Sequence, residues 1–439
     1  MTRPKLDFIL PTGSRPAVST WMLTPIDRYA FQWVIQGTWV FDSRLDASTL
    51  KHGLARLLDH YPLLAGRVAG GTRIEWSDTG VPFVEETEPT LNVADFDAAC
   101  VDVARFAHRF SPSRIRRGAA PLMTLKLTHL RDGCVLAICC SHACLDGNGF
   151  YTMARNLARA ATGAAFPAPV FERRGGETLR RSRWEVARAA RQAGWRRVSP
   201  LDIVRFAVAR PGLHDRAFVA HFSPAALQRC KETLARDAAC PRLSTNSALL
   251  AHVAHSLAAL VGLADRDRFA LSVAVDQRGR ASSVPEDFAG NAVAIVVTPP
   301  IPARADRAAI AARVHACVEP VTNRPSPSLE SLAQLTREVV AHRLPWTPLP
   351  RNRLGRRRKL FYTNSFARFP VYDLDFGDES RPVRPVRAIP HNLGDPVILW
   401  PSPPPVGGLD VYFSGKLARA VSRVARDHPW WTEMRRFDA

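Results

Sequence analysis

The sequence predicts an α/β (α+β) protein of two lobes, and three observations support this fold class. The chain has 439 residues, of which 46% are hydrophobic, so it can bury a large core and is longer than one typical domain. Short apolar runs typical of strands alternate with segments whose apolar residues recur every three or four positions, as in helices. An arginine-rich stretch broken by Gly-Gly, Ser-Pro and Pro-Gly pairs then divides the chain.

These breaks in pattern define three segments. We expect an N-terminal lobe at 1–172, a basic crossover linker at 173–213 and a C-terminal lobe at 214–439. In the last segment the pattern predicts, in order, a strand at 217–222, a helix capped by Ser223 and opened by Pro224, a helix from Ala248, a strand at 409–413 and a helix from Lys416. The polar residues 243–247 precede the second of these helices, and capping is their simplest role.

A hairpin and a helix surround the most informative stretch of the first lobe. Two apolar runs, 121–130 and 134–140, are joined by a turn that contains Gly133, which is typical of a β-hairpin. From Phe150 the apolar period changes to that of a helix, and Gly163 is suited to end it.

His142 therefore ends a strand, and Asp146 and Gly147 form a tight loop into the helix. A neutral imidazole at this place can accept a proton from a hydroxyl or an amine, because its unperturbed pKa of about 6.5 lies close to working pH. Asp146 either orients the imidazole or braces the loop. The alternative for His142 is a half-buried histidine satisfied by a backbone carbonyl, since three defined positions in six are a weak pattern.

Six sequence blocks are spread over the chain. They read LTPID at 23–27, YPLLAGR at 61–67, GVPFVE at 80–85, SHACLDGNGF at 141–150, DQRGR with PEDFAGNAV at 276–293, and RFPVYDLDFG at 368–377. In this order they resemble the motifs of BAHD-type acyltransferases, a family within the superfamily of chloramphenicol acetyltransferase and the condensation domains of nonribosomal peptide synthesis. The resemblance covers essentially the whole chain.

The resemblance implies two chloramphenicol-acetyltransferase-like lobes, each a mixed β-sheet covered by helices, with an active-site tunnel at their interface. It implies transfer of an acyl group from a thioester, acyl-coenzyme A, to a hydroxyl or amine of a small-molecule acceptor in secondary metabolite biosynthesis. His142 is then the general base of a reaction without an acyl-enzyme, while Asp146 turns away and pairs with Arg278. Gly147 and Gly149 permit the close turn.

The resemblance also implies supporting residues. Asn364 stands eleven positions before the DFG aspartate, where many relatives carry a hydroxyl group, and is the candidate for stabilising the oxyanion. Asp375 and Gly377, in the DFG-like block, are expected to support the structure. The expected donor-binding residues are Ser244, Thr245, Gly290 and Asn291.

One departure from the family motifs, and one position where the chain agrees with BAHD members, bear on the alternatives. The family's DFGWG is here DFGDE, which weakens the assignment to the plant-like branch. The first alternative function is a carrier-protein-dependent condensation enzyme, but such domains usually carry a second histidine where this chain has Ser141. The second is a non-catalytic binding homologue, against which the presence of both His142 and Asp146 argues.

The chain carries a net charge of +20, with 60 lysines and arginines. Two basic runs stand out, at 173–197 and 351–359. Each is either a solvated face or a field that attracts the phosphates of coenzyme A or an acidic acyl carrier protein. Binding to nucleic acid is not expected, because no matching motif accompanies the charge.

The eight cysteines include no C-x-x-C pair and no zinc-like spacing. The resemblance implies no metal or redox cofactor. Cys144 lies two residues from His142, yet covalent catalysis by this thiol is not favoured, because the family varies its position. No apolar stretch approaches a membrane span, and residues 1–16 lack a signal-peptide core. We therefore expect a cytoplasmic protein. We also expect it to be a monomer.

Overall fold

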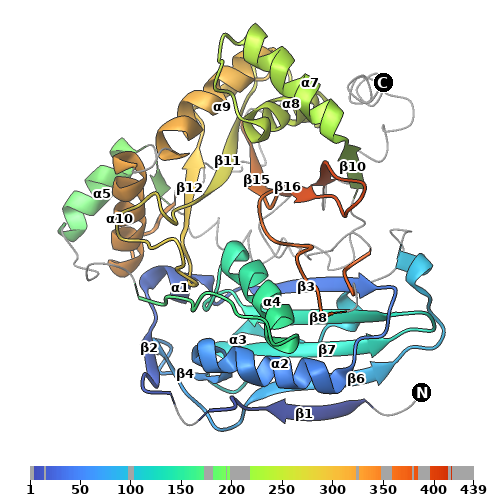
Figure 1. Cartoon of the computed structure of the whole chain (residues 1–439). Coiled ribbons are helices and arrows are strands. Elements are labelled where there is room, and N and C mark those ends of the chain that lie inside the picture. The colour runs from blue at the N-terminus through green and yellow to red at the C-terminus, as the bar shows by residue number, and fades with distance from the viewer. Residues whose placement is uncertain are drawn as a thin grey trace.

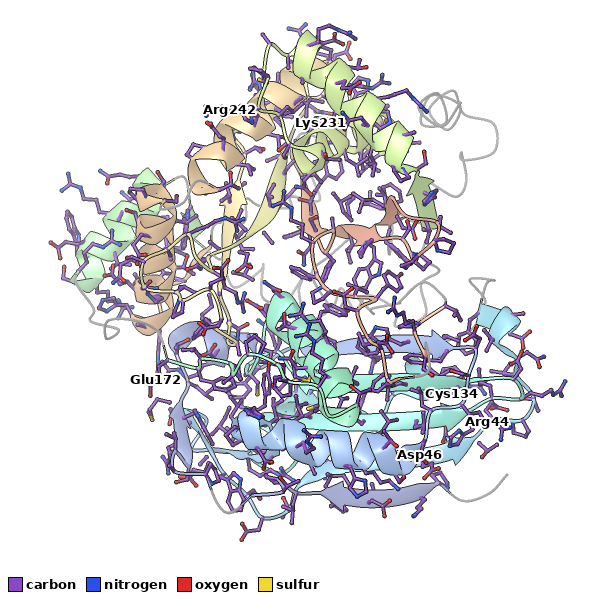
Figure 2. The ribbon with its side chains drawn as sticks, in the orientation of Figure 1. Arg44, Asp46, Cys134, Glu172, Lys231 and Arg242 are labelled. Carbon is purple, nitrogen blue, oxygen red and sulfur yellow. The ribbon has the colours of Figure 1, made fainter. Side chains whose placement is uncertain are left out.

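Two β-sheets, one in each half of the chain, organise the computed structural model (Figure 1). The structure describes residues 4–13, 16–96, 103–172, 181–193, 195–197, 218–322, 326–347, 358–377, 380–383, 396–413 and 417. In Figure 2 the side chains of Arg44, Asp46 and Cys134 belong to the lower lobe, and those of Lys231 and Arg242 lie at the far end of the upper one.

The N-terminal sheet has five strands in the order β1-β6-β7-β8-β3. In this order their bounds are Lys5–Ile9, Val81–Thr87, Met123–His129, Cys134–Ser141 and Val34–Phe41. The β6–β7 pair is parallel and the other three pairs are antiparallel. Helices α2 (Ala47–His60) and α4 (Gly147–Ala161) pack side by side on one face of this sheet (Figure 1).

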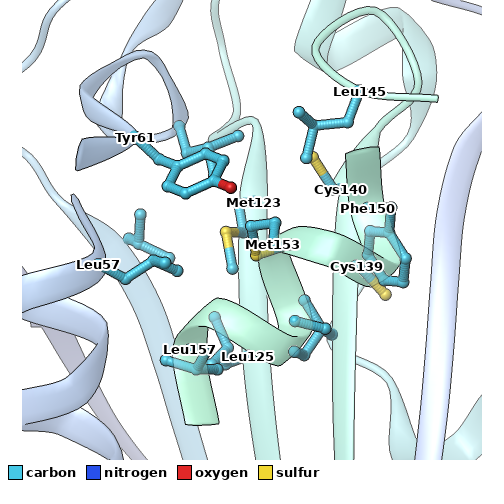
Figure 3. Close-up of a cluster of buried hydrophobic side chains, with 14 of the residues drawn as sticks. Leu57, Tyr61, Met123, Leu125, Cys139, Cys140, Leu145, Phe150, Met153 and Leu157 are labelled. Carbon is cyan, nitrogen blue, oxygen red and sulfur yellow. The ribbon is translucent and has the colours of Figure 1, made fainter. Parts of the chain in front are cut away.

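Helix α4 builds the core of this lobe. Its buried face carries Phe150, Met153 and Leu157, which pack with Met123 of β7 and with Tyr61 (Figure 3). Full burial of each such side chain is worth about 1.5–3 kcal/mol. The helix that follows the His142 loop is therefore anchored along its length.

Smaller elements complete the first half of the chain. A three-stranded sheet has the order β2-β5-β4, with bounds Thr20–Met22, Arg73–Glu75 and Arg67–Ala69. The short helices are α1 (Pro25–Ala30), η1 (Pro62–Ala65), η2 (Val93–Phe96), η3 (Val103–Phe106) and α3 (Pro112–Arg116).

The C-terminal sheet has the order β10-β17-β16-β15-β11-β12, and β13 also pairs with β11. The bounds are Phe218–Phe222, Leu409–Phe413, Pro396–Pro401, Arg358–Ser365, Arg268–Asp276, Val293–Val297 and, for β13, Ile301–Pro302. The pairs β11–β15 and β15–β16 are parallel, so this sheet is mixed too. The helices described in this half are α7 (Pro224–Asp237), α8 (Thr245–Leu260), α9 (Arg307–Thr322) and α10 (Pro327–Ala341).

The two halves meet through aromatic side chains. The Tyr151 ring of α4 lies 5.6 Å from the Trp400 ring of β16 and 6.0 Å from the Phe366 ring, centroid to centroid. The Trp39 indole N–H of β3 donates a hydrogen bond of 2.8 Å to the carbonyl oxygen of Val371. Residues that follow β15 thus complete the core of the first lobe.

Most of the predicted elements are present. The hairpin at 121–130 and 134–140 corresponds to β7 and β8, and the strands predicted at 217–222 and 409–413 are β10 and β17. Ser223 caps α7, accepting the N–H of Ala226 at 3.2 Å. The predicted start of the next helix at Ala248 is wrong, because α8 begins at Thr245. The helix predicted from Lys416 lies outside the described residues apart from one position.

Part of the predicted linker is described. Helix α5 (Arg183–Gln192) packs against α10, and β9 (Arg196–Arg197) pairs with β14 (Trp346–Thr347). This stretch therefore packs against elements of the second half of the chain. The division of the chain at 172 and 213 stays a prediction.

Candidate active site

The first residue of the site, His142, follows directly after β8. Its backbone N–H donates to the carbonyl oxygen of Trp33 at 3.0 Å, and the Trp33 indole meets the imidazole edge to face, with centroids 6.0 Å apart. Because Val34 pairs with Ser141 across β3 and β8, both residues emerge at the same end of the sheet. The imidazole is half-buried there.

Asn291, in the loop before β12, holds His142 at two points. Its Oδ1 lies 3.1 Å from Nδ1 of the imidazole, and its Nδ2 donates to the backbone carbonyl of His142 at 2.8 Å. The same Nδ2 donates to Oδ1 of Asp27 at 2.8 Å. Asn291 is 5% exposed, so these bonds are well shielded from water.

Asp146 caps α4 and is fully buried. Its carboxylate accepts the N–H groups of Gly149 at 2.9 Å and Ala292 at 2.8 Å. Arg278 forms a two-pronged pair with it, at 2.9 Å and 3.0 Å. These four bonds turn the carboxylate toward the second lobe and brace the loop, which is the arrangement expected of a structural aspartate.

Arg278 ties this pair to its surroundings. Its guanidinium also donates to Asp276 at 2.9 Å and to the backbone carbonyls of Phe288 and Gly290 at 2.5 Å and 2.7 Å. Burial alone would lower the pKa of Arg278, but the charges and hydrogen bonds of Asp146 and Asp276 raise it above its ordinary value. The side chain is therefore a permanent cation at the lobe interface.

Gly147 and Gly149 have a different role from the one predicted. Neither has a left-handed backbone, so the turn does not require them. A Cβ on Gly149 would lie 2.2 Å from the carbonyl oxygen of Ala289, and one on Gly147 would lie 3.0–3.1 Å from the rings of Phe369 and Phe366. They allow the close approach of the second lobe to the start of α4.

Asn364 lies in β15, where it pairs with Ile398 of β16. The chain that follows brings Phe366 against Gly147, so this strand leads toward the His142 loop. Stabilisation of an oxyanion by Asn364 stays a prediction.

The expected donor-binding residues are dispersed. Ser244 caps α8, accepting the N–H of Ser247 at 3.0 Å and donating to its hydroxyl at 2.9 Å, and Thr245 is the first residue of that helix. The Gly290 carbonyl accepts a hydrogen bond from Arg278, and the Asn291 side chain is hydrogen-bonded to His142. Their contacts are thus structural within the protein, and contact with a donor stays a prediction.

Asp375 and Gly377 form a local turn. The Asp375 carboxylate accepts the N–H of Gly377 at 3.0 Å and pairs with Arg381 at 3.0 Å. Gly377 has φ of +93°, which suits glycine. Asp378 and Glu379 stand where the family motif has tryptophan and glycine, and both lie outside the described residues.

Cys144 is fully packed inside the His142 loop. A hydrogen bond with Cys140, together with burial, raises the pKa of its thiol well above the ordinary value of 9.0. It is therefore poorly suited to act as a nucleophile, since the thiolate is the reactive form.

Among the described residues, no three His, Cys, Asp or Glu side chains are placed to hold a metal ion. No helix in the described part of the chain is long and apolar enough to cross a membrane. Most of the basic run at 351–359 and the start of that at 173–197 lie outside the described residues.

Two residues at the site had no predicted role: Asp27, which stands in the LTPID block, and Trp33, which lies in none of the six blocks. The pattern Thr24-x-x-Asp27 is a capping-box signal, and α1 does carry that box. It identifies a helix start but gives no indication of the bond to Asn291.

The predicted resemblance is confirmed at the level of the family. The Transferase family model matches residues 7–419, and the chain belongs to this family of BAHD-type acyltransferases. The two-lobed chloramphenicol-acetyltransferase-like fold class is confirmed with it.

Among particular relatives, tryptamine hydroxycinnamoyltransferase 2 of Oryza sativa subsp. japonica is 28% identical over 289 residues, which is 62% of each chain. The chain thus spans less than two thirds of that relative. Two of the solved structures that resemble this chain cover nearly all of its length. TRI101 of F. graminearum, complexed with coenzyme A and T-2 mycotoxin, has a TM-score of 0.72 at 17% identity, over 94% of this chain and 99% of that one. Vinorine synthase has a TM-score of 0.69 at 16% identity, over 96% and 97%.

Proposed function

We propose that this protein transfers an acyl group from a coenzyme A thioester to a hydroxyl or amine of a small-molecule natural-product acceptor. The single observation that carries the proposal is His142: a half-buried imidazole at the end of β8, held by Asn291 and placed at the interface of the two lobes. The family membership and the names of the relatives support the same reaction class.

In the proposed reaction both substrates are bound together. His142 takes the proton from the acceptor as its oxygen or nitrogen attacks the thioester carbonyl, and the tetrahedral intermediate then expels the coenzyme A thiolate, which takes up that proton. Asp146 and Arg278 hold the loop and transfer no proton. Asn364 is the proposed donor to the oxyanion, where one such group is worth a factor of about 10²–10³ in rate.

No acyl-enzyme forms in this mechanism, because the base acts on the acceptor rather than on a protein nucleophile. Incubation with an acyl-coenzyme A alone should therefore leave the intact protein mass unchanged. A stable mass increase at a cysteine or serine would contradict the direct transfer.

The decisive test is His142→Ala, assayed with a panel of acyl-coenzyme A donors and of alcohol and amine acceptors. We expect turnover to fall by about 10²–10⁴, as for loss of a general base, with unchanged thermal unfolding. Cys144→Ala is the matched control in the same loop and should keep near-wild-type turnover. Equal rates for wild type and His142→Ala would overturn the proposal.

The donor is proposed as free coenzyme A thioester. Comparing it with the same acyl group on an acyl carrier protein tests this directly, and a marked preference for the carrier would reassign the protein to the condensing class. Binding of coenzyme A without any turnover across the panel would point to the non-catalytic alternative. A monomeric state and a cytoplasmic location stay predictions, and the first is measurable by light scattering.

A further inference from the structure

Helix α5 carries aromatic and cationic side chains on the side that it turns to solvent. Trp184, Arg188 and Arg191 stand four and then three residues apart, so they lie along one side of the helix. On the opposite side, Val186 and Ala190 are 0% exposed and pack against α10. In Figure 1, α5 lies on the outside of the molecule, and α10 separates it from the C-terminal sheet.

Two cation–π contacts order these side chains. The guanidinium of Arg188 lies over the Trp184 ring, 5.9 Å from its centroid, and that of Arg191 lies over the Trp346 ring of β14, at 5.7 Å. We call these four side chains, Trp184, Arg188, Arg191 and Trp346, the α5 ridge. A guanidinium held over a ring keeps its full positive charge, because the ring itself is neutral.

The charge of the α5 ridge is not balanced locally. Within the described part of the chain, neither Arg188 nor Arg191 forms an ion pair, and both are exposed. Arg181, just before α5, differs from them, because it pairs at 2.6 Å with Glu338, whose side chain is 0% exposed. The carboxylate of Glu185 closes the capping box of α5. The two arginines of the ridge are therefore available to an anionic partner.

Trp184 adds apolar surface at one end of the ridge. Its side chain is 71% exposed, although tryptophan is highly buried on average. Outside a protein core, an indole is favoured at the boundary between water and hydrocarbon, at the level of the lipid headgroups. Arginine forks bind phosphate oxygens through two N–H groups. The ridge therefore suits a surface that offers phosphate and apolar groups side by side.

We propose that the α5 ridge docks the protein on bilayers that contain anionic phospholipid. A bilayer presents phosphate at every point of its surface, so an outward-facing helix needs no shaped counterpart to lie on it. The net charge of +20 attracts such a surface from a distance. Because the apolar side of α5 packs against α10, contact stays at headgroup level and salt should reverse it. This inference goes beyond the proposed function and does not depend on it.

The first experiment measures co-sedimentation of the full chain with vesicles of phosphatidylcholine, alone or with about 30% phosphatidylglycerol. We expect binding to the anionic vesicles to be tighter by about 10-fold or more, and to be lost between about 0.1 M and about 1 M salt. The double change Arg188→Glu with Arg191→Glu should weaken it by about 10-fold or more, and Trp184→Ala by about 3-fold. Equal binding of wild type to both kinds of vesicle would overturn the proposal.

A matched control separates the α5 ridge from the net charge. Arg229→Glu with Arg236→Glu makes the same change in charge on α7, where both side chains are exposed and lie seven residues apart. In Figure 1, α7 lies at the far end of the C-terminal lobe, away from α5. This control should bind nearly as wild type does, and a loss equal to that of the ridge variant would overturn the proposal. If the ridge variant does not fold, Arg188→Gln with Arg191→Gln replaces it, with a smaller expected loss.

The second experiment distinguishes a lipid surface from an acidic protein. Because the chain has 10 tryptophans, the fluorescence of Trp184 is obtained as the difference between wild type and Trp184→Phe. We expect brominated phosphatidylcholine in the anionic vesicles to quench this difference. Vesicle binding without quenching would place the contact elsewhere on the molecule. Binding of an acidic acyl carrier protein that needs Arg188 and Arg191, with no binding to vesicles, would replace the lipid surface by a protein partner. Either result would overturn the proposal.

Discussion

Asp146 and Asp375 both come from motifs recognised in the sequence, and each pairs with an arginine at a similar distance, 2.9 Å and 3.0 Å. Their surroundings differ. The side chains of Asp146 and Arg278 are 0% and 6% exposed and lie 132 residues apart, whereas those of Asp375 and Arg381 are 43% and 70% exposed and lie six apart. The first pair joins the two lobes, and the second closes a surface turn. Burial, rather than distance, determines what such a pair is worth.

The largest expected effect is at the buried pair. Asp146→Asn and Arg278→Ala should each lower the free energy of unfolding by about 3–5 kcal/mol, because each leaves a buried charge without its partner. The double variant should lose less than the sum of the two. Chemical unfolding of all four proteins gives the coupling free energy, and strict additivity would show that the pair does not act as a unit.

The second-largest effect is expected at Gly149, where the second lobe closely approaches the start of α4 beside the buried pair. Gly149→Ala places a methyl group against the Ala289 carbonyl and should cost about 1–3 kcal/mol of stability, as expected for overpacking. Gly13→Ala is the control, because among the described residues a Cβ there meets only Asp59, at 3.5 Å. Equal thermal unfolding of the two variants would contradict a tight contact between Gly149 and the second lobe.

The exposed pair should matter least for stability. Asp375→Asn and Arg381→Ala should each change the free energy of unfolding by no more than about 1 kcal/mol, because water and salt screen the charges. Raising the ionic strength should reduce this effect further while leaving that of the buried pair nearly unchanged. A loss of several kcal/mol would show that exposure does not predict how much the Asp375–Arg381 pair contributes to stability.

The smallest effect is expected at Cys144, which shares its loop with Asp146. Because a hydrogen bond with Cys140 and burial raise the pKa of the thiol, almost none of it is thiolate near pH 8. Iodoacetamide should leave it unlabelled in the native protein and label it after unfolding, as peptide mass spectrometry would show. Rapid native labelling would mean that the loop opens.

Local patterns predicted the parts of the molecule that local forces decide. The hairpin before His142, the Ser223 cap and the glycine-terminated helix α4 all follow from short-range propensities. The start of α8 was misplaced because Ser244 and Ser247 are equally good caps by sequence, and only the fold selects the first.

The contacts that complete the site could not be predicted from the sequence, for a different reason. Asn291 was assigned to the donor because of its place in a motif, yet its contacts are with side chains far away in the sequence. The glycines of the His142 loop were assigned to a turn, whereas a carbonyl of the second lobe requires Gly149. Such contacts depend on how the lobes dock, and a single sequence carries no local signal for docking.

The residues around His142 come from both halves of the chain, and this has a consequence for biosynthesis. The last strand of the N-terminal sheet ends at Ser141, but Asn291 is made 149 residues after His142. At about 5–20 residues per second the ribosome needs roughly 7–30 s to cover that distance. During most of this interval the carboxylate of Asp146 lacks Arg278, and throughout it the imidazole of His142 lacks Asn291. Folding of the first lobe on the ribosome therefore cannot produce a competent base, and a nascent chain that stalls before residue 291 carries the whole HxxxDG motif without the site it belongs to.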